Sequence, residues 1–262
     1  MTSPELDELF AQTLIGDYDD ELPWKAVSAL RRIGTREVFD RAAAWCKSGN
    51  PMERARGASV IAQLGKTEEH RTNSFPEESY LAVSQMLQKE NEIQPLNSAI
   101  SALGHLDNPT AVPLIVSYQQ HPEAEIRFAV TFALGQFAND PKAIQVLIEL
   151  TRDLDDDVRD WAVFGLGTLG DTDSAEIRDA LFACLNDTND DVREEAMVGL
   201  AKRKDQRVLP ALIAALNQSE LDDPGITQLT IEAADLMLDF ADERKDWSGT
   251  EYAAALRERY SF

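Results

Sequence analysis

Small and apolar residues recur at fixed positions behind an arginine in the middle of the chain. The clearest copy follows Arg159, where positions −1, +3, +6, +7 and +10 hold Val158, Ala162, Gly165, Leu166 and Leu169. At about 100° per residue these positions lie on one side of an α-helix, and the same pattern follows Arg127 and Arg193. The pattern therefore predicts three amphipathic helices, each of which buries the side that carries these residues.

The copies of this signature are regularly spaced. Arg127, Arg159 and Arg193 are 32 and 34 residues apart, and weaker copies occur at four further marks, Pro23, Arg54, Leu96 and Thr227. An interval of this length is typical of a two-helix unit that stacks on its neighbours. The seven copies predict about seven helix pairs in one array.

The segments between the copies have the pattern of a second helix. Asp140 followed by Pro141 is a typical helix start, and apolar residues keep helical spacing as far as Leu150. Aspartate-rich turns such as 155–157 then precede the signature helix. We expect an all-α protein, a right-handed α-solenoid in which residues 1–262 form one domain, with terminal caps over 1–20 and 241–262 and the repeats over 21–240.

One interval is longer than the others. Arg54 and Leu96 are 42 residues apart, and the excess falls in residues 66–75. An insertion at a turn between repeats projects from one edge of an array, where such loops often bind ligands. A passive long turn explains the same residues.

Composition restricts the cellular setting. No apolar run approaches the ~20 residues that span a bilayer, and the acidic N-terminus lacks the features of a secretory signal, so we expect a cytoplasmic protein without a membrane partner. Cys46 and Cys184, the only cysteines, lie in apolar helical stretches. They are expected to be buried thiols without a redox role.

The net charge of −22 bears on the partner. Nucleic acid binding depends on Lys and Arg that replace counterions at the phosphates, and the chain has no basic stripe. An acidic surface instead attracts a basic protein. Solubility of a long solenoid, or adaptation to a salt-rich cytoplasm, is the competing explanation of the charge.

The repeat length, the arginine at the start of the second helix and the Ala-Leu-Gly core resemble the short bacterial HEAT-like repeats of the phycobilin-lyase type, over roughly residues 20–240. Such arrays serve as protein-binding scaffolds, bilin-lyase subunits, DNA glycosylases and a di-iron hydroxylase. The hydroxylase uses His-Glu dipeptides, and none of His70, His105 and His121 is followed by Glu. The net charge opposes the glycosylase, which needs a basic cleft. A lyase-like subunit stays open as the enzymatic alternative.

The side of the signature helix opposite its core carries positions +1, +5 and +8 and is expected to line the concave surface of the solenoid. In the central repeats this side holds an apolar stripe of Phe128, Phe132 and Phe164, with Val163 and Val198 beside it and Asp160 and Glu194 at its edge. Large exposed aromatic residues are typical anchors for a protein partner. The alternative is that neighbouring helices bury the rings.

Two further features have a structural and a functional interpretation. Position +8 is small in five repeats, which favours close approach of the adjacent helix over a ligand. The recurrent arginines favour a ladder of Arg–Asp hydrogen bonds over an anion site. Turn carboxylates cap helices, but stacking would also gather some of them into an acidic rim, which we define as Asp156, Asp157, Asp190 and Asp191.

No motif for catalysis, for a metal or for a cofactor is recognisable in the chain. We therefore expect a non-catalytic scaffold or adaptor that binds a basic protein through the aromatic stripe and the acidic rim. An inhibitor or immunity protein that masks a cationic enzyme would suit such a surface. The alternative is a phycobilin-lyase-like subunit that acts in chromophore attachment.

Overall fold

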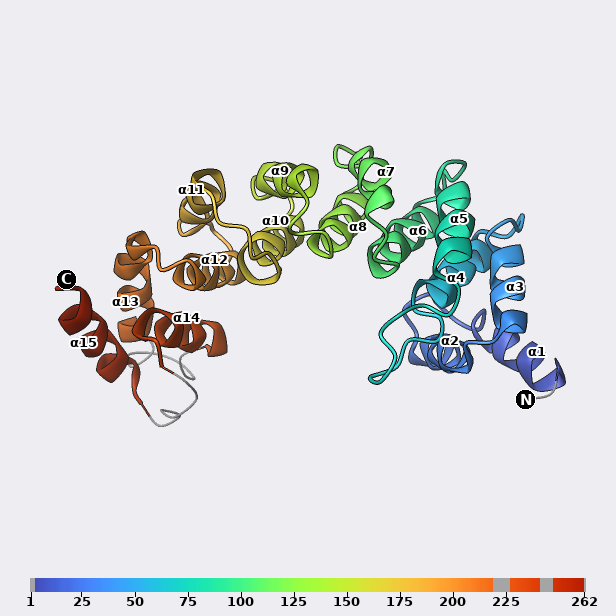
Figure 1. The fold of residues 1–262 in the computed structure, drawn as a ribbon, viewed down its shortest axis with the longest axis horizontal. Coiled ribbons are helices and arrows are strands. Elements are labelled where there is room, and N and C mark those ends of the chain that lie inside the picture. Colours follow the sequence, from blue (N-terminus) through green and yellow to red (C-terminus); the bar gives the residue numbers. More distant parts are fainter. Residues whose placement is uncertain (1–2, 219–226, 241–246, 262) are drawn as a thin grey trace. The chain divides into compact units, whose positions relative to one another are not determined.

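The computed structural model describes residues 3–218, 227–240 and 247–261. All regular structure in these ranges is helical (Figure 1). The chain divides into two compact units, residues 1–137 and 138–262, and each is described by itself. None of the described helices is long and apolar enough to cross a membrane.

In the first unit, helices with the signature alternate with helices that lack it. The helices without it are α1 (Ser3–Gln12), α3 (Arg36–Trp45), α5 (Pro76–Leu87) and α7 (Val112–Val116), the last preceded by the 3-10 turn η1 (Pro109–Ala111). The signature helices are α2 (Glu21–Ile33), α4 (Pro51–Ala62), α6 (Ile93–His105) and α8 (Ala124–Gly135). Each carries one of the predicted marks.

The second unit continues the alternation. Its helices without the signature are α9 (Pro141–Leu150), α11 (Ala175–Cys184), α13 (Leu209–Gln218), preceded by η3 (Gln206–Val208), and the terminal α15 (Gly249–Tyr260). The signature helices are α10 (Asp156–Phe164), which continues as the π-helical turn η2 (Gly165–Leu169), α12 (Asp190–Lys202) and α14 (Gln228–Leu238), whose N-cap is Thr227. In Figure 1, α9 and α11 lie in one row and α10 and α12 in another. The predicted all-α solenoid of helix pairs is confirmed.

The inserted residues 66–75 form the connection between α4 and α5. Asn73 is buried at its end, where its Nδ2 donates to Ile61 O at 2.7 Å and its Oδ1 accepts from Phe75 N at 2.9 Å. Residues 67–72 are exposed. Lys66, at the other end, donates to His105 O at 2.5 Å, so the segment is anchored at both ends. A binding role for it stays a prediction.

Consecutive signature helices approach each other at backbone distance. A Cβ atom built on Gly104 would lie 2.7 Å from Ala133 Cα, and one built on Gly167 would lie 3.0 Å from Gly199 Cα. In both cases position +8 of one copy faces position +6 of the next. The small residues at +8 thus accommodate the adjacent helix, as predicted.

The signature arginine joins helices within and between repeats. In all four copies, one Nη1 donates to the carbonyl oxygen six residues earlier, at 3.1, 3.0, 3.0 and 2.8 Å for Arg54, Arg127, Arg159 and Arg193. That carbonyl belongs to the turn behind the preceding helix. Carbonyl groups left unpaired at a helix end are thereby bonded.

Arg54 and Arg159 also bind a carboxylate of the next repeat. Arg54 donates to both oxygens of Glu90 at 2.6 and 2.9 Å, and Arg159 donates to both oxygens of Asp187 at 2.8 and 2.9 Å. Asp187 in turn offers its backbone oxygen to Arg193. The predicted Arg–Asp ladder is confirmed at Arg159, and at Arg54 a glutamate takes the place of the aspartate.

Aspartate and asparagine cap several helices at the turns. Asp140 accepts from the backbone of Lys142 and Ala143, and Asp155 accepts from Val158 N at 3.1 Å. Both cysteines are buried free thiols, and burial raises the pKa of Cys46 to about 12 and that of Cys184 to about 11. The predicted capping and the predicted burial of the thiols are therefore confirmed.

Arg203 departs from the signature at core position +10, where an apolar residue is expected. Its side chain is 8% exposed and donates to the carbonyl oxygens of Leu166, Gly167 and Thr172 at 2.7, 3.0 and 2.8 Å. The buried guanidinium thus bonds the backbone at the end of η2. A charged group takes a core position because the preceding helix supplies its acceptors.

Arg159→Met tests the contribution of the ladder. The change removes the paired hydrogen bonds to Asp187, and both side chains are only 13% exposed. We expect the free energy of unfolding to fall by about 2 kcal/mol. Urea unfolding followed by circular dichroism measures it. Arg36→Met is the control, because it breaks a similar pair with Glu78 in which the side chains are 49% and 51% exposed. An equal loss in both variants would contradict the prediction.

Gly104→Ala tests the close approach of α6 and α8. The added methyl group would meet the backbone of Ala133 at 2.7 Å. The helices must separate, so we expect a loss of about 1–3 kcal/mol despite the higher helix propensity of alanine. Gly49→Ala, where nothing lies within 4 Å, is the matched control and should leave the unfolding midpoint almost unchanged. A stabilised Gly104→Ala protein would show that the approach is looser.

Candidate functional site

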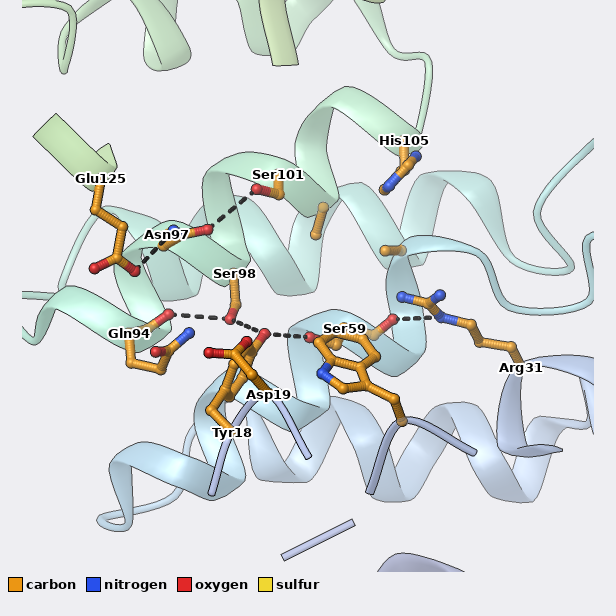
Figure 2. A pocket seen from close by; sticks show the side chains of 13 residues that line it. Tyr18, Asp19, Arg31, Ser59, Gln94, Asn97, Ser98, Ser101, His105 and Glu125 are labelled. Atoms are coloured by element: carbon orange, nitrogen blue, oxygen red, sulfur yellow. Dashed lines mark hydrogen bonds between the residues drawn. The ribbon is translucent and has the colours of Figure 1, made fainter. Parts of the chain in front are cut away.

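A polar pocket of about 280 Å³ lies in the first unit, on the side of the signature helices that carries positions +1 and +5. We call this side the +5 face. The pocket is shown in Figure 2. Its lining includes Trp24 and Asn97 at position +1, Ser59 and Ser101 at +5, and Arg31 and Ala62 at +8. The repeat therefore brings equivalent positions of α2, α4 and α6 to the same cavity.

Hydroxyl groups connect the centre of the pocket. Tyr18 lies in the turn before α2. Its phenol oxygen is hydrogen-bonded to Ser98 Oγ at 2.9 Å and to Ser59 Oγ at 3.3 Å. Ser98 donates to Gln94 O at 3.0 Å. The ring of Tyr18 packs edge-on against Trp24, with centroids 5.4 Å apart. These bonds fix the turn 13–20 against α4 and α6.

One end of the pocket is cationic. The Nε of Arg31 donates to Ser59 O at 2.9 Å, and its guanidinium lies 5.8 Å from the centroid of Trp24. Burial lowers the pKa of Arg31 to about 10. Burial, and then the charges of Arg31 and Lys66, lower the pKa of His105 to about 4. The imidazole is therefore neutral at pH 7, and the positive charge resides on the arginine and the lysine.

The other end of the pocket carries an acid. Glu125, in the first turn of α8, accepts a hydrogen bond from Asn97 Nδ2 at 2.9 Å, and Asn97 accepts from Ser101 at 3.3 Å. Asp19 also lines the cavity. Figure 2 shows Glu125 and Arg31 on opposite sides of it. The pocket thus has a charge difference from end to end.

A group of carboxylates occupies the signature helices of the second unit. Burial raises the pKa of Asp160 to about 6, and the charges of Asp191 and Asp157 add to the rise. The buried Oδ1 of Asp160 has no hydrogen-bond partner among the described residues. Asp160 is one of the predicted site residues and marks position +1 of α10.

Two glutamates of α12 belong to the same group. Burial raises the pKa of Glu195 to about 7; a hydrogen bond from Thr168, 3.1 Å away, opposes the rise, and the charge of Asp160 adds to it. Burial also raises the pKa of Glu194. We call Asp160, Glu194 and Glu195 the carboxylate group. Among the described residues, no three His, Cys, Asp or Glu could together hold a metal ion.

The rings of the predicted aromatic stripe are partly covered, and their binding role stays a prediction. Phe128, Phe132 and Phe164 are half-buried. Phe132 packs edge-on against His105 with centroids 5.1 Å apart, and Phe164 does the same against Trp161 at 5.5 Å. The rings therefore have neighbours within their own units and present only part of their surface to a partner.

Val163 and Val198 do not belong to any exposed surface, and this part of the prediction is wrong. Val163 is 0% exposed and Val198 is 2% exposed, so both are core residues. Val163, at position +4, stands next to the +5 face, whereas Val198 is at position +5 itself. A helix that is covered by neighbours on three sides buries them as well.

The four residues of the acidic rim are all exposed. Asp156 accepts from Asn189 Nδ2 at 3.0 Å, and Asp190 pairs with Arg193. Asp157 and Asp191 lie close enough to Asp160 to affect its titration. Asp156 and Asp190 thus form bonds within the repeats, whereas Asp157 and Asp191 add negative charge beside the carboxylate group.

The sequence analysis did not identify several residues of the pocket in the first unit and of the carboxylate group in the second. Arg31 stands at position +8, where five other copies have Ala or Gly, so a break in the signature marked it. Glu195 lies one residue beyond the predicted Glu194, at a position that the wheel leaves between the core and the +5 face. Tyr18 precedes the first copy, and no periodicity identifies it.

A sequence profile of HEAT repeats matches residues 81–167 and 150–235. Protein YibA of Escherichia coli K12 is 29% identical over 221 residues, which cover 83% of this chain and 76% of YibA. The X-ray structure of YibA has a TM-score of 0.69 at 25% identity and covers 98% of this chain and 93% of that chain.

Two further proteins are similar over less of the sequence or only in fold. The phycocyanobilin lyase subunit alpha of a Nostoc species is 29% identical over 84 residues, which cover 32% of this chain and 30% of that subunit. A designed armadillo repeat protein in complex with the peptide (KR)4 has a TM-score of 0.51 at 15% identity and covers 79% of this chain and 99% of that chain. The helix-pair array is thus shared with known repeat proteins.

Glu195→Gln tests the burial of the carboxylate group. The pKa of Glu195 is about 7 in the folded chain, against an ordinary value of 4.5, so the folded state binds more protons than the unfolded state between these two pH values. The contribution of Glu195 to the free energy of unfolding therefore falls as the pH rises from about 4.5 to 7. We expect Glu195→Gln to raise the unfolding midpoint at pH 8 and to flatten its pH dependence in that window. Urea unfolding at several pH values measures both effects. Glu149→Gln on the exposed side of α9 is the control, and an equal change there would refute the assignment to Glu195.

Proposed function

Because the chain belongs to the HEAT-repeat family, we propose that it is a non-catalytic binding protein that holds a basic segment of a protein partner on the +5 face of its second unit. HEAT-type arrays bind through surfaces that successive repeats extend. The main support for the proposal is the carboxylate group. It lies on two consecutive signature helices, so an extended segment could contact both.

The electrostatics of the carboxylate group favour a cationic partner. Asp160, Glu194 and Glu195 all have a raised pKa, which means that their ionised forms are poorly compensated in the free protein. A lysine or arginine side chain would supply the missing counter-charge and a hydrogen-bond donor for Asp160 Oδ1. Binding would then favour the ionised carboxylates.

Aromatic surface next to the acids supports the same partner. Trp161 and Phe164 are half-buried on α10, beside Asp160. Partly exposed rings bind the aliphatic stems and the cationic heads of lysine and arginine. The designed armadillo repeat protein of similar fold is in complex with the peptide (KR)4, which fits this chemistry.

The specific role that we propose is to mask a cationic protein, as an inhibitor or immunity protein does. The net charge of −22 supports it, since long-range attraction speeds association with a basic partner. A cytoplasmic location is part of the proposal. The two cysteines, both unpaired and buried, are consistent with a reducing compartment.

Titration with a basic peptide tests the proposal. We expect an octapeptide of alternating lysine and arginine to bind the intact protein, and Asp160→Asn combined with Glu195→Gln to weaken the binding by about tenfold or more. Isothermal titration calorimetry at low and moderate salt measures the affinity. Binding should weaken as the salt concentration rises.

Matched variants separate the carboxylate group from net charge. Asp179→Asn combined with Glu176→Gln removes the same charge from α11, on the other row of helices, and should weaken binding much less. Equal weakening by both pairs would show that net charge alone attracts the peptide. Absence of binding at low salt would overturn the proposal.

A lyase-like role is the second candidate. The similarity to the phycocyanobilin lyase subunit alpha favours it, over 84 residues. Incubation of the protein with phycocyanobilin and an apo-phycobiliprotein tests it directly. Covalent attachment of the chromophore, seen as a coloured polypeptide after denaturation, would favour the lyase over the scaffold.

A further inference from the structure

The pocket of the first unit has properties that the proposed partner does not require. It is separate from the carboxylate group, and its volume of about 280 Å³ lies just below the ~300 Å³ at which pockets for drug-sized ligands begin. The lining is rich in hydroxyl and amide groups, from Tyr18, Ser59, Gln94, Asn97 and Ser101. A small polar ligand suits such a cavity.

Arg31 is incompletely paired. Its Nε donates to Ser59 O. Within residues 3–218, 227–240 and 247–261, neither Nη of Arg31 has a hydrogen-bond partner and no carboxylate forms an ion pair with the guanidinium. The guanidinium is therefore a partly buried cation with two free donor groups, next to the ring of Trp24. Lys66 adds positive charge at this end, close enough to affect His105. A carboxylate would complete the hydrogen bonds of Arg31.

The opposite end has the reverse charge. Glu125 is exposed, and among the described residues its one hydrogen-bond partner is Asn97, which donates to Oε1, so the second oxygen is available to a donor. Asp19 is exposed as well and lines the same cavity. An ammonium group placed at this end would be attracted by the carboxylate of Glu125. Figure 2 shows Arg31 and Glu125 facing the cavity from opposite sides.

We propose that this pocket binds a zwitterion of amino-acid size, with its carboxylate on Arg31 and its ammonium group at Glu125. The hydroxyl groups of Tyr18 and Ser101 lie between the two ends and accept or donate to polar atoms of the ligand. The site lies wholly within the first unit. It does not depend on the basic partner proposed for the second.

Titration of the intact protein with ω-amino acids tests the proposal. γ-Aminobutyrate and ε-aminocaproate carry the two charges at different separations, whereas caproate and n-hexylamine each carry one. We expect at least one of the ω-amino acids to bind about tenfold more tightly than caproate and than n-hexylamine, because both ends of the pocket contribute. Isothermal titration calorimetry measures the affinities at constant ionic strength.

Variants assign the two ends. Arg31→Gln should abolish the preference for the zwitterion over n-hexylamine, and Glu125→Gln should abolish the preference over caproate. Arg32→Gln and Glu123→Gln are the matched controls, because they remove the same charges one or two residues away without lining the cavity. Circular dichroism checks that Arg31→Gln, which loses a bond to α4, still folds. Glu125 is exposed, so Glu125→Gln tests the site even where Arg31→Gln does not fold.

Three results would overturn the proposal. Caproate or n-hexylamine could bind as tightly as the ω-amino acids, which would indicate a site for one charge only. The control variants could weaken binding as much as the pocket variants. The third result would be that no binding is detected for any of the four compounds at millimolar concentrations.

Discussion

The close approach of consecutive signature helices determines most of what this protein can do. Gly104 against Ala133, and Gly167 against Gly199, allow backbones to meet where a single Cβ atom would already be too close. Helices at this separation leave little room between the side chains that flank the contact. Residues next to it are therefore desolvated even when they are polar, and the +5 face acquires groups that are neither fully in water nor fully in the core.

Desolvation acts on this face with opposite sign on acids and bases. It raises the pKa of Asp160 and Glu195 in the second unit and lowers the pKa of Arg31 and His105 in the first. The close approach of the helices thus explains the shifted pKa values at both sites. The side chains at each site determine whether a ligand of positive or of negative charge is favoured there. The carboxylate group of the second unit consists of acids alone, whereas the pocket of the first unit has a cation, Arg31, at one end and a carboxylate, Glu125, at the other.

The fold was predictable because the signature recurs in positions that only a helix brings to one side. All seven copies lie on helices, and the bonds of Arg54 and Arg159 to the next repeat follow from the arginine's fixed place at the start of the signature helix. The surface was harder to predict. A helical wheel separates a core side from an outer side, but it does not state how many neighbours cover a residue between them. Val163, at position +4, lies at that boundary and Val198, at position +5, lies on the outer side, yet helices that sequence alone does not place bury both.

The residues missed in the first unit have a similar explanation. Tyr18 enters the pocket from a turn outside the signature, and its hydroxyl reaches Ser59 and Ser98, 41 and 80 residues further along the chain. Arg31 was visible only as an exception at position +8. Exceptions of this kind deserve particular weight in a repeat protein, because the repeat fixes what packing needs at each position. A charged residue in place of the usual Ala or Gly costs desolvation, and a ligand that pairs with it offsets part of that cost.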